Sequence, residues 1–436
     1  MGHPFFKEDR VRGGCMNSKL RKYLTIIALG LAGGSIYFLP YIKYVFYDAQ
    51  ISTMGITNTQ SGLMLTMYTI GNMILYIPGG IIADKVSPKK ALVISLLSTT
   101  ALAYIYAFSM NFAVAMVIWL GLSFSTAFVF WSSLMKAIRI IGTEEEQGFM
   151  YGLYYACNGI TGALTNTLAL NVYKTAGDDM SSGFVRAVIS GGSVAAVAGI
   201  ILIFLMKEKK KDAWWNLRPD YHSLEEPKFQ LSDLGKLLKM PVVWVVALTI
   251  FCGYGYYTST SYFNPFLTEV IGVSPESSGL ISIIRNYLLL LLAPVGGILA
   301  DKVFKSTCKW LMTAFLILAA LFGIVMILPS DISPMAASLY TLIPGAFAMM
   351  MYGVVFSTVS EAGIPRMMTG TTIGIASIIG YLPDSIYSVI FGKWMDQHGA
   401  AGYNYIFTFL MITGIIGAVL AFTIYRLGKK NREQAI

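Results

Sequence analysis

The chain has 436 residues, of which 56% are hydrophobic and only 13% are charged. Soluble domains carry about 25% charged residues, so this composition points to lipid as the solvent. The net charge of +9 does not indicate a nucleic-acid-binding protein, because Lys and Arg occur in short runs between apolar stretches, as they do where they set membrane orientation. The four cysteines have no metal-ligand spacing, and we expect neither a metal nor another cofactor.

Twelve apolar stretches are long enough to cross a bilayer, which takes roughly 20 residues. They cover residues 23–47, 60–82, 90–109, 112–135, 148–171, 184–206, 242–267, 278–300, 308–328, 336–358, 370–393 and 404–427. The pattern predicts an all-α membrane protein with 12 transmembrane helices, as six-helix bundles over 23–206 and 242–427. Residues 1–22 and 428–436 are predicted tails, and residues 207–241 a linker.

The basic residues predict the orientation of the chain. If both termini lie in the cytoplasm, the inner segments hold 27 of the 32 Lys and Arg residues and the outer loops hold three. This asymmetry is the one that the positive-inside rule describes. The tails and the linker are therefore expected on the cytoplasmic side.

The two halves repeat each other. GGIIADK at 79–85 returns as GGILADK at 296–302, a shift of 217 residues, and QGFMYGLYYACNG at 147–159 matches TGTTIGIASIIGY at 369–381, a shift of 222. Nearly equal shifts at corresponding helices indicate a duplication. Parallel halves of this kind place the solute site between them, near the middle of the membrane.

The repeated segment resembles the loop 2–3 signature of the major facilitator superfamily (MFS). Gly79 and Gly80 precede Asp84 and Lys85 in the first copy, although Ser87-Pro88 replaces the family's second glycine. The resemblance implies the MFS fold and a secondary transporter that works by alternating access as a monomer. Residues 131–148 and 360–384 resemble poorly characterised bacterial carriers related to nitrate/nitrite and organic-anion transporters, which implies an inner-membrane location. The glycine-rich nitrate signatures are absent, which disfavours nitrate itself.

The same resemblance suggests an inner gate. Gly80 and Gly297 should let helices approach closely, while Asp84 and Asp301 could cap a neighbouring helix or pair with a cation. Glu361 could pair with Arg366 or with Arg139, its repeat counterpart. Alternatively, these charges only anchor helix ends. The full set of expected gate residues is Gly80, Asp84, Lys85, Gly297, Asp301, Lys302, Lys136, Arg139, Glu361 and Arg366.

Arg285 is the most informative residue, because it lies about 12 Å inside the eighth predicted span at ~1.5 Å per residue. A guanidinium facing lipid at that depth costs several kcal/mol, so it should face a cavity or a partner. It could bind an anionic group or form a structural ion pair. Asp384 is expected at a similar depth, and could pair with Arg285 and carry protons, or simply neutralise it. Lys43 is expected to extend its ammonium to the outer interface.

Aromatic residues are abundant at expected cavity-lining positions, although most aromatics in such a protein serve packing. Tyr68 is the repeat counterpart of Arg285. Asn158 is polar in mid-span and could bond either solute or a neighbouring helix. The candidate solute-binding residues are Arg285, Tyr37, Tyr68, Trp131, Tyr257, Tyr287, Tyr381 and Asn158, and Asp384 is the candidate for proton coupling.

Three hypotheses about function remain open. The first is a transporter of a small organic anion such as a carboxylate, phosphate ester or sulfonate, with protons as a candidate coupling ion. The second is a carrier of a neutral or amphiphilic solute, in which Arg285 and Asp384 form a fixed pair. The third is a membrane sensor derived from a transporter. No nucleotide-binding loop or Ser–His pair is present, so neither an enzyme nor an ATP-driven pump is expected.

Overall fold

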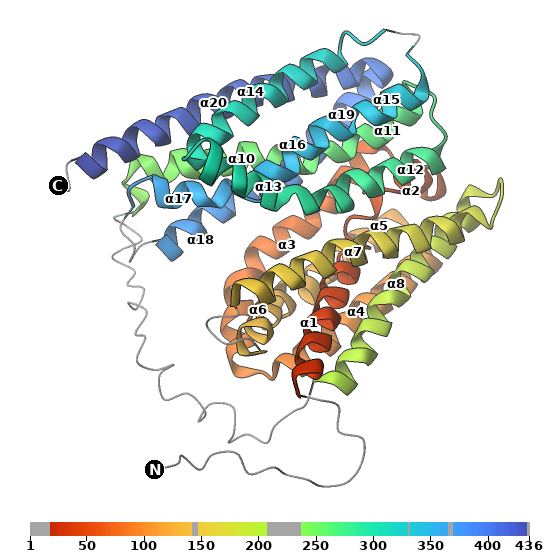
Figure 1. The fold of residues 1–436 in the computed structure, drawn as a ribbon. Coiled ribbons are helices and arrows are strands. Elements are labelled where there is room, and N and C mark those ends of the chain that lie inside the picture. Colours follow the sequence, from red (N-terminus) through yellow and green to blue (C-terminus); the bar gives the residue numbers. More distant parts are fainter. Residues whose placement is uncertain (1–17, 142–146, 207–236, 330–331, 365–368, 434–436) are drawn as a thin grey trace, which may run out of the picture.

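The helices of this chain form two bundles that converge at one end and diverge at the other (Figure 1). The computed structural model describes residues 18–141, 147–206, 237–329, 332–364 and 369–433. All regular secondary structure in these ranges is helical. The ends of α2, α11 and α12 mark the converging side in Figure 1, and α6, α17 and α18 mark the diverging side.

The N-terminal bundle holds the helices that precede the linker. They are α1 (Ser18–Ile36), α2 (Tyr47–Met54), α3 (Asn58–Lys85), α4 (Pro88–Ser109), α5 (Phe112–Ser123), α6 (Phe130–Ile141), α7 (Gln147–Lys174) and α8 (Met180–Leu205). A π-helical turn, Phe124–Phe128, joins α5 to α6.

The C-terminal bundle is built from shorter pieces that often follow one another end to end. They are α10 (Pro241–Ser259), α11 (Phe263–Glu269), α12 (Pro275–Ile283), α13 (Ala293–Ile298), α14 (Thr307–Val325), α15 (Pro334–Tyr340), α16 (Leu342–Tyr352), α17 (Thr358–Glu361), α18 (Thr369–Gly380), α19 (Pro383–His398) and α20 (Gly402–Glu433). Two π-helical turns, Ile284–Leu288 and Leu299–Val303, flank the region of α13.

Within these ranges, eight helical stretches are long and apolar enough to cross a membrane. The last of them, Ile375–Lys429, spans both of the final two stretches expected from the sequence. Large apolar side chains such as Phe108, Phe204 and Ile327 are more than three-quarters exposed, as is normal for a surface that faces lipid. The number of twelve spans stays a prediction.

Helix breaks fall at corresponding places in the two halves. In the first half α1 ends at Ile36 and Pro40 lies in the turn that follows, while in the second a 3₁₀ turn separates α10 from α11, which contains Pro265. Breaks free backbone carbonyls that must find donors inside a membrane protein. The Trp119 indole donates to the Pro40 carbonyl at 3.3 Å, and the Asn264 amide of the opposite half donates to the carbonyls of Tyr44 and Val45 at 3.2 and 3.1 Å.

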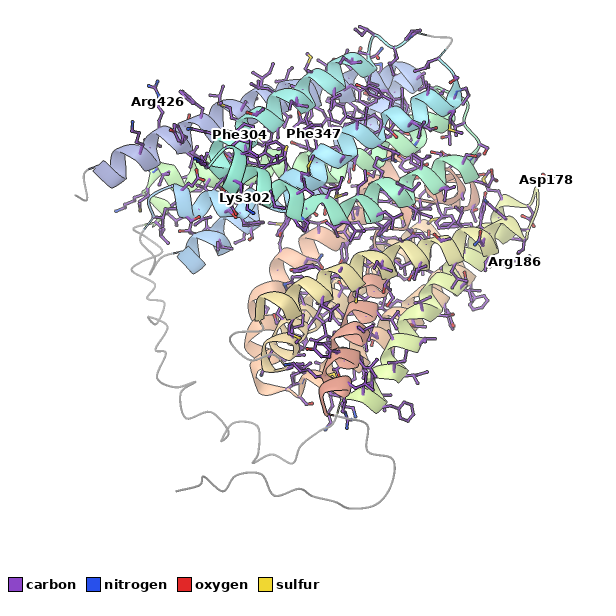
Figure 2. The ribbon with its side chains drawn as sticks, viewed as in Figure 1. Asp178, Arg186, Lys302, Phe304, Phe347 and Arg426 are labelled. Atoms are coloured by element: carbon purple, nitrogen blue, oxygen red, sulfur yellow. The ribbon has the colours of Figure 1, made fainter. Side chains whose placement is uncertain are left out.

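Hydrogen bonds between the halves gather at the converging end. Besides Asn264, they include bonds from Tyr44 to Thr258 at 2.9 Å and from Thr66 to the Ser385 carbonyl at 2.7 Å. We call this the interlocked end, and the diverging side the open end. Figure 2 shows Asp178 and Arg186 near the interlocked end of the N-terminal bundle, and Lys302 on the C-terminal bundle toward the open end.

Glycines of the repeated segment bring helix backbones into contact, but not those expected from the sequence. A methyl group at Gly79 would overlap the carbonyl oxygen of Phe128, and one at Gly296 would overlap that of Met350. These two pairs are repeat counterparts of each other. A methyl group at Gly297, in contrast, would meet its nearest atom, in Val354, at 3.9 Å, an ordinary contact. The expectation for Gly297 is therefore wrong by one residue, and the surroundings of Gly80 lie outside the described part of the chain.

The glycine contacts predict opposite effects of two neighbouring substitutions. Gly296→Ala should lower the apparent melting temperature of the detergent-solubilised protein, because overpacking against a backbone carbonyl costs about 1–3 kcal/mol. Gly297→Ala should leave the melting temperature unchanged or raise it, because alanine favours a helix by about 1 kcal/mol over glycine. Equal losses in the two variants would contradict this packing.

Candidate functional site

Arg285 lies in the π-helical turn Ile284–Leu288 and its side chain is fully buried. One terminal nitrogen donates to the Thr341 hydroxyl at 2.8 Å and the other to the Ser282 hydroxyl at 2.7 Å. The guanidinium carbon lies 5.5 Å from the centre of the Phe263 ring. The cation therefore sits inside protein, between segments around α12, α11 and α16, and not against lipid.

Among the described residues, no carboxylate matches the Arg285 guanidinium. Within that part of the chain its Nε has no hydrogen-bond partner, and its hydrogen bonds go to the neutral hydroxyls of Thr341 and Ser282. The expected ion pair with Asp384 is therefore wrong for this structure. Gly345 makes room for the arginine stem, since a methyl group there would come within 2.6 Å of its Cγ. The sequence thus builds a fitted pocket for a cation and leaves the cation without a counterion.

Asp384 lies in the first turn of α19 and is 2% exposed. Its Oδ1 accepts from the Thr258 hydroxyl at 2.5 Å, and its Oδ2 accepts from Tyr254 at 2.6 Å and from Tyr41 at 3.3 Å. Because Thr258 donates its only hydroxyl proton to Asp384, the 2.9 Å bond between Thr258 and Tyr44 must be donated by Tyr44. Three hydroxyl donors serve an acceptor-only group, so this arrangement suits an ionised carboxylate.

The environment of Asp384 joins the two halves. Tyr41 and Tyr44 come from the N-terminal bundle, and Tyr254 and Thr258 come from α10 of the C-terminal bundle. The carboxylate is therefore stabilised across the boundary between the bundles. Any change in its charge acts directly on contacts that hold the interlocked end together.

Lys43 is 4% exposed and does not reach the outer interface as expected. Its ammonium lies 3.5 Å from the hydroxyls of Tyr262 and Ser388 and 5.3 Å from the centre of the Tyr262 ring, all in the opposite half. The positive charge of Lys43 also attracts the Asp384 carboxylate. The expectation of snorkelling is wrong because the break after α1 turns this segment inward, onto the other bundle.

Within the described part of the chain, the charged side chains that are fully buried are Lys43, Arg285 and Asp384. Two of them are cations and one is a carboxylate. Burying an unmatched charge costs several kcal/mol. The described interior therefore carries a surplus positive charge that an anionic guest could compensate.

Four of the expected solute-binding tyrosines connect to Asp384 through ring contacts. Tyr37 and Tyr68 have ring centroids 6.5 and 5.9 Å from that of Tyr41, and Tyr381 packs edge-on against Tyr254 at 4.7 Å. Tyr257 lies 5.5 Å from Tyr254. The Tyr68 hydroxyl forms a hydrogen bond with the Thr126 hydroxyl at 2.8 Å. We call this aromatic group around Asp384 the tyrosine cluster; it comprises Tyr37, Tyr41, Tyr44, Tyr68, Tyr254, Tyr257 and Tyr381.

The remaining candidates lie elsewhere. Tyr287 packs on Gly162 of the opposite half, where an added methyl would come within 2.6 Å of its ring. Asn158 donates to the Tyr154 hydroxyl one turn earlier in α7 at 2.9 Å. Trp131 packs against the apolar core of the N-terminal bundle. Each of these three side chains thus makes its own local contact.

The expected gate residues whose side chains the structure describes lie on different elements of the open end. Glu361 caps α14, because its carboxylate accepts from the Ser306 hydroxyl at 2.7 Å, from the Cys308 amide at 3.2 Å and from the Thr307 amide. These described bonds differ from the arginine pairing that the sequence suggested. Asp301 and Lys302 are exposed in the π-helical turn Leu299–Val303. Lys136 is half-buried in α6.

Several gate predictions cannot be placed. The side chains of Asp84, Lys85 and Arg139 lie outside the described part of the chain, as does Arg366 altogether. Their roles stay predictions.

Sequence reasoning missed Tyr41, Tyr254 and Thr258 as donors to Asp384, and Tyr44 as the donor to Thr258. A usable signal was the helix-breaking Pro40, since a break near the membrane edge allows flanking polar residues to point inward. The tyrosines themselves gave no signal, because they are equally common as packing residues.

Three comparisons bear on this site. A family model described as "Major Facilitator Superfamily" matches residues 23–388. Inner membrane protein YqcE of Escherichia coli is 28% identical over 413 residues, covering 93% of this chain and 95% of that protein. Inner membrane protein YihN of the same species is 25% identical over 417 residues, covering 95% and 98%.

A more distant relative carries a substrate in its name. The "Probable sulfoacetate transporter SauU" of Cupriavidus necator is 22% identical over 291 residues, covering 62% of this chain and 64% of that protein. Among solved structures, a bacterial homologue of the human lysosomal transporter Spinster, in an inward-facing and unoccupied conformation, matches with a TM-score of 0.70 at 14% identity. It covers 96% of this chain and 99% of that chain.

The attraction between Lys43 and Asp384 predicts non-additive losses of stability. Lys43→Met and Asp384→Asn should each lower the apparent melting temperature, because each leaves an opposite charge buried without its counterpart. The double variant should lose less than the sum of the two, by a coupling of about 0.5–3 kcal/mol. Strictly additive losses would show that the two charges are independent.

Proposed function

Since the chain belongs to the Major Facilitator Superfamily, whose family model matches residues 23–388, we propose that it is a secondary active transporter of a small organic anion. Its relatives place it in the inner membrane as a multi-pass protein, and its family makes it a transporter of small solutes rather than an enzyme. The nature of the solute, alternating access and proton coupling are the parts that we propose.

The surplus buried cation is the observation that carries the anion proposal. Arg285 is fully buried and, within the described ranges, is bonded to hydroxyls only and keeps an unused Nε donor. Its planar fork suits a carboxylate, phosphate ester or sulfonate, which can accept two parallel hydrogen bonds. Tyr287, two residues further on, contacts the opposite half. The turn that carries Arg285 therefore borders the region between the bundles, where solutes bind in this fold.

The distant relative SauU is named as a probable sulfoacetate transporter, and this name supports an anionic solute. A sulfonate or carboxylate group also matches a single guanidinium in charge and in hydrogen-bond geometry. We therefore place small sulfonates and carboxylates first among the anions to be tested.

We further propose that this structure represents a state open to the cytoplasm. With twelve spans and both termini inside, the interlocked end faces outward and the open end faces the cytoplasm. The gathering of inter-half hydrogen bonds at one end and the divergence of the bundles at the other support this state (Figure 1). The exposure of Asp301 also fits, since the contacts expected of the inner gate would form when that side closes.

Asp384 is the proposed proton-coupling residue. Its carboxylate draws donors from both bundles, and it is attracted to Lys43 across their boundary. Protonation would remove that attraction and turn the carboxyl into a donor competing with Tyr41 and Tyr254 for hydrogen-bond geometry. The bundles could then separate at the interlocked end, which couples proton binding to the change of access.

The role of Arg285 predicts the effect of its removal on transport. Arg285→Gln should reduce the saturable uptake of an anionic solute into proteoliposomes at least about tenfold. The reason is that one charge-assisted hydrogen bond is worth roughly 1.5–3 kcal/mol. Arg186→Gln is a matched control, since Arg186 is an exposed cation at the interlocked end that donates to Thr175 of its own half. The control should transport normally.

Two outcomes would oppose the anion proposal. Arg285→Gln could fold with an unchanged melting temperature and carry anions at the normal rate. Alternatively, the variant could lose transport of neutral and of anionic solutes equally. That result would favour the hypothesis of a carrier for a neutral or amphiphilic solute.

The role of Asp384 predicts separation of coupling from binding. Asp384→Asn should lose accumulation driven by a proton gradient, because an amide cannot take up a proton at physiological pH. It should retain exchange of labelled for unlabelled solute, which needs no net proton movement. Accumulation that responds to the gradient as strongly as in the unmodified protein would refute Asp384 as the coupling site.

A further inference from the structure

Asp396, near the end of α19, binds the first turn of α3 in the opposite half. Its Oδ1 accepts from the backbone amide and the side-chain amide of Asn58, both at 2.9 Å. Its Oδ2 accepts from the backbone amide of Thr59 at 2.8 Å and from the Thr59 hydroxyl. One exposed carboxylate thus receives four hydrogen bonds across the boundary between the bundles.

These bonds complete the cap of α3. The amides at a helix start have no partners within the helix. The Thr57 hydroxyl accepts from the Gln60 backbone amide at 3.1 Å, within the same half. Asp396 accepts from the backbone amides of Asn58 and Thr59. A negative charge at this position is further favoured by the helix dipole. The N-terminal bundle therefore leaves part of its helix cap to the other bundle.

The side chain of Asn58 is held in the orientation that this contact needs. Its Oδ1 accepts from the Tyr47 hydroxyl at 2.9 Å, so its Nδ2 is the end that faces Asp396. The amide therefore cannot turn over without losing two hydrogen bonds.

The backbones of α3 and α19 touch beside this contact. A methyl group at Gly392 would lie 2.6 Å from the Asn58 carbonyl oxygen, and one at Gly62 would overlap the Ser388 carbonyl. The two helices are thus in direct backbone contact over their shared length at the interlocked end. Such a contact cannot stretch gradually and must either form or separate.

Within the described part of the chain, comparison of the two repeats shows that a cap supplied by the opposite half is present at the start of α3 but not at the start of its counterpart, α12. At the shift of 222 the counterpart of Asp396 is Lys174, at the end of α7, and at the shift of 217 the counterpart of Asn58 is Pro275, at the start of α12. A cation cannot cap a helix start. The α12 helix is capped instead by Ser274 of its own half, whose hydroxyl accepts from the Ser277 amide at 3.3 Å.

We propose that Asp396 and the first turn of α3 form the outer gate latch of this transporter, which holds the interlocked end closed and opens when access changes. The proposal rests on the alternating access proposed above, but not on the identity of the solute. It assigns to Asp396 a positioning role: the residue sets the fraction of molecules open to the outside and does not bind solute.

The latch is tested by a distance measurement between the halves. Spin labels would be placed at Asp178 in the N-terminal bundle and at Met335 in the C-terminal bundle, both exposed, after replacement of the four native cysteines by alanine. Double electron–electron resonance in proteoliposomes should show that Asp396→Asn raises the long-distance, outward-open fraction about fivefold, the effect of losing a helix cap. Thr59→Ala, which removes one donor only, should give a smaller shift in the same direction.

Asp179→Asn is the matched control. Asp179 is also an exposed aspartate that caps a helix, α8, but its partner Ser182 belongs to the same half. This variant should leave the distance distribution unchanged. The proposal is overturned if Asp396→Asn leaves the distribution of the parent unchanged, or if Asp179→Asn shifts it equally.

The latch also predicts a transport readout. A larger outward-open fraction should lower the external half-saturation concentration about fivefold in Asp396→Asn, because apparent affinity scales with the competent fraction. The spin-label result requires no solute, so it stands even if organic anions are not carried. An absence of saturable uptake together with an increased outward-open fraction would leave the latch intact and count against the proposed solute.

Discussion

A permanent cation cannot rest in hydrocarbon, and the position of Arg285 follows from that constraint. The chain encloses the guanidinium between hydroxyls of Ser282 and Thr341 and the ring of Phe263. Hydroxyls orient a cation but do not neutralise it. With Lys43 also buried and Asp384 as the one fully buried carboxylate among the described residues, the charge balance of the interior is left for a mobile anion to complete.

The two bundles are joined by polar contacts that a change in charge or access can break. Asp384 gathers hydroxyls from both bundles, Asn264 supplies donors to the broken backbone after α1, and Asp396 caps α3. Each of these groups has at least one hydrogen-bond partner in the opposite half. Separation of the bundles therefore exposes several polar groups at once, which favours two discrete states over a continuum. Coupling between proton, solute and gate follows from their sharing of this boundary.

The sequence predicted the helical membrane fold, the duplication and the burial of Arg285 and Asp384, because hydropathy and the cost of buried charge are local properties. It did not predict their partners. Lys43 was expected at the outer interface because it closes the first predicted span, whereas the break after Ile36 turns it onto the other bundle. Gly297 was chosen over Gly296 because two adjacent glycines look alike until the facing backbone of Met350 is known. For Glu361 the sequence suggested an arginine partner, Arg366 or Arg139, which stays a prediction, and it did not suggest the cap of α14 that the described bonds form. Partners across helices depend on packing that one sequence does not display.

A structure of the protein with an anionic solute bound tests the central claim most directly. Thermal-shift screening of small sulfonates, carboxylates and phosphate esters would supply the solute, and cryo-electron microscopy would locate it. We predict that its anionic group lies within hydrogen-bond distance of the Arg285 guanidinium, on the free Nε side. A solute bound between the bundles with Arg285 still bonded only to Ser282 and Thr341 would contradict the account.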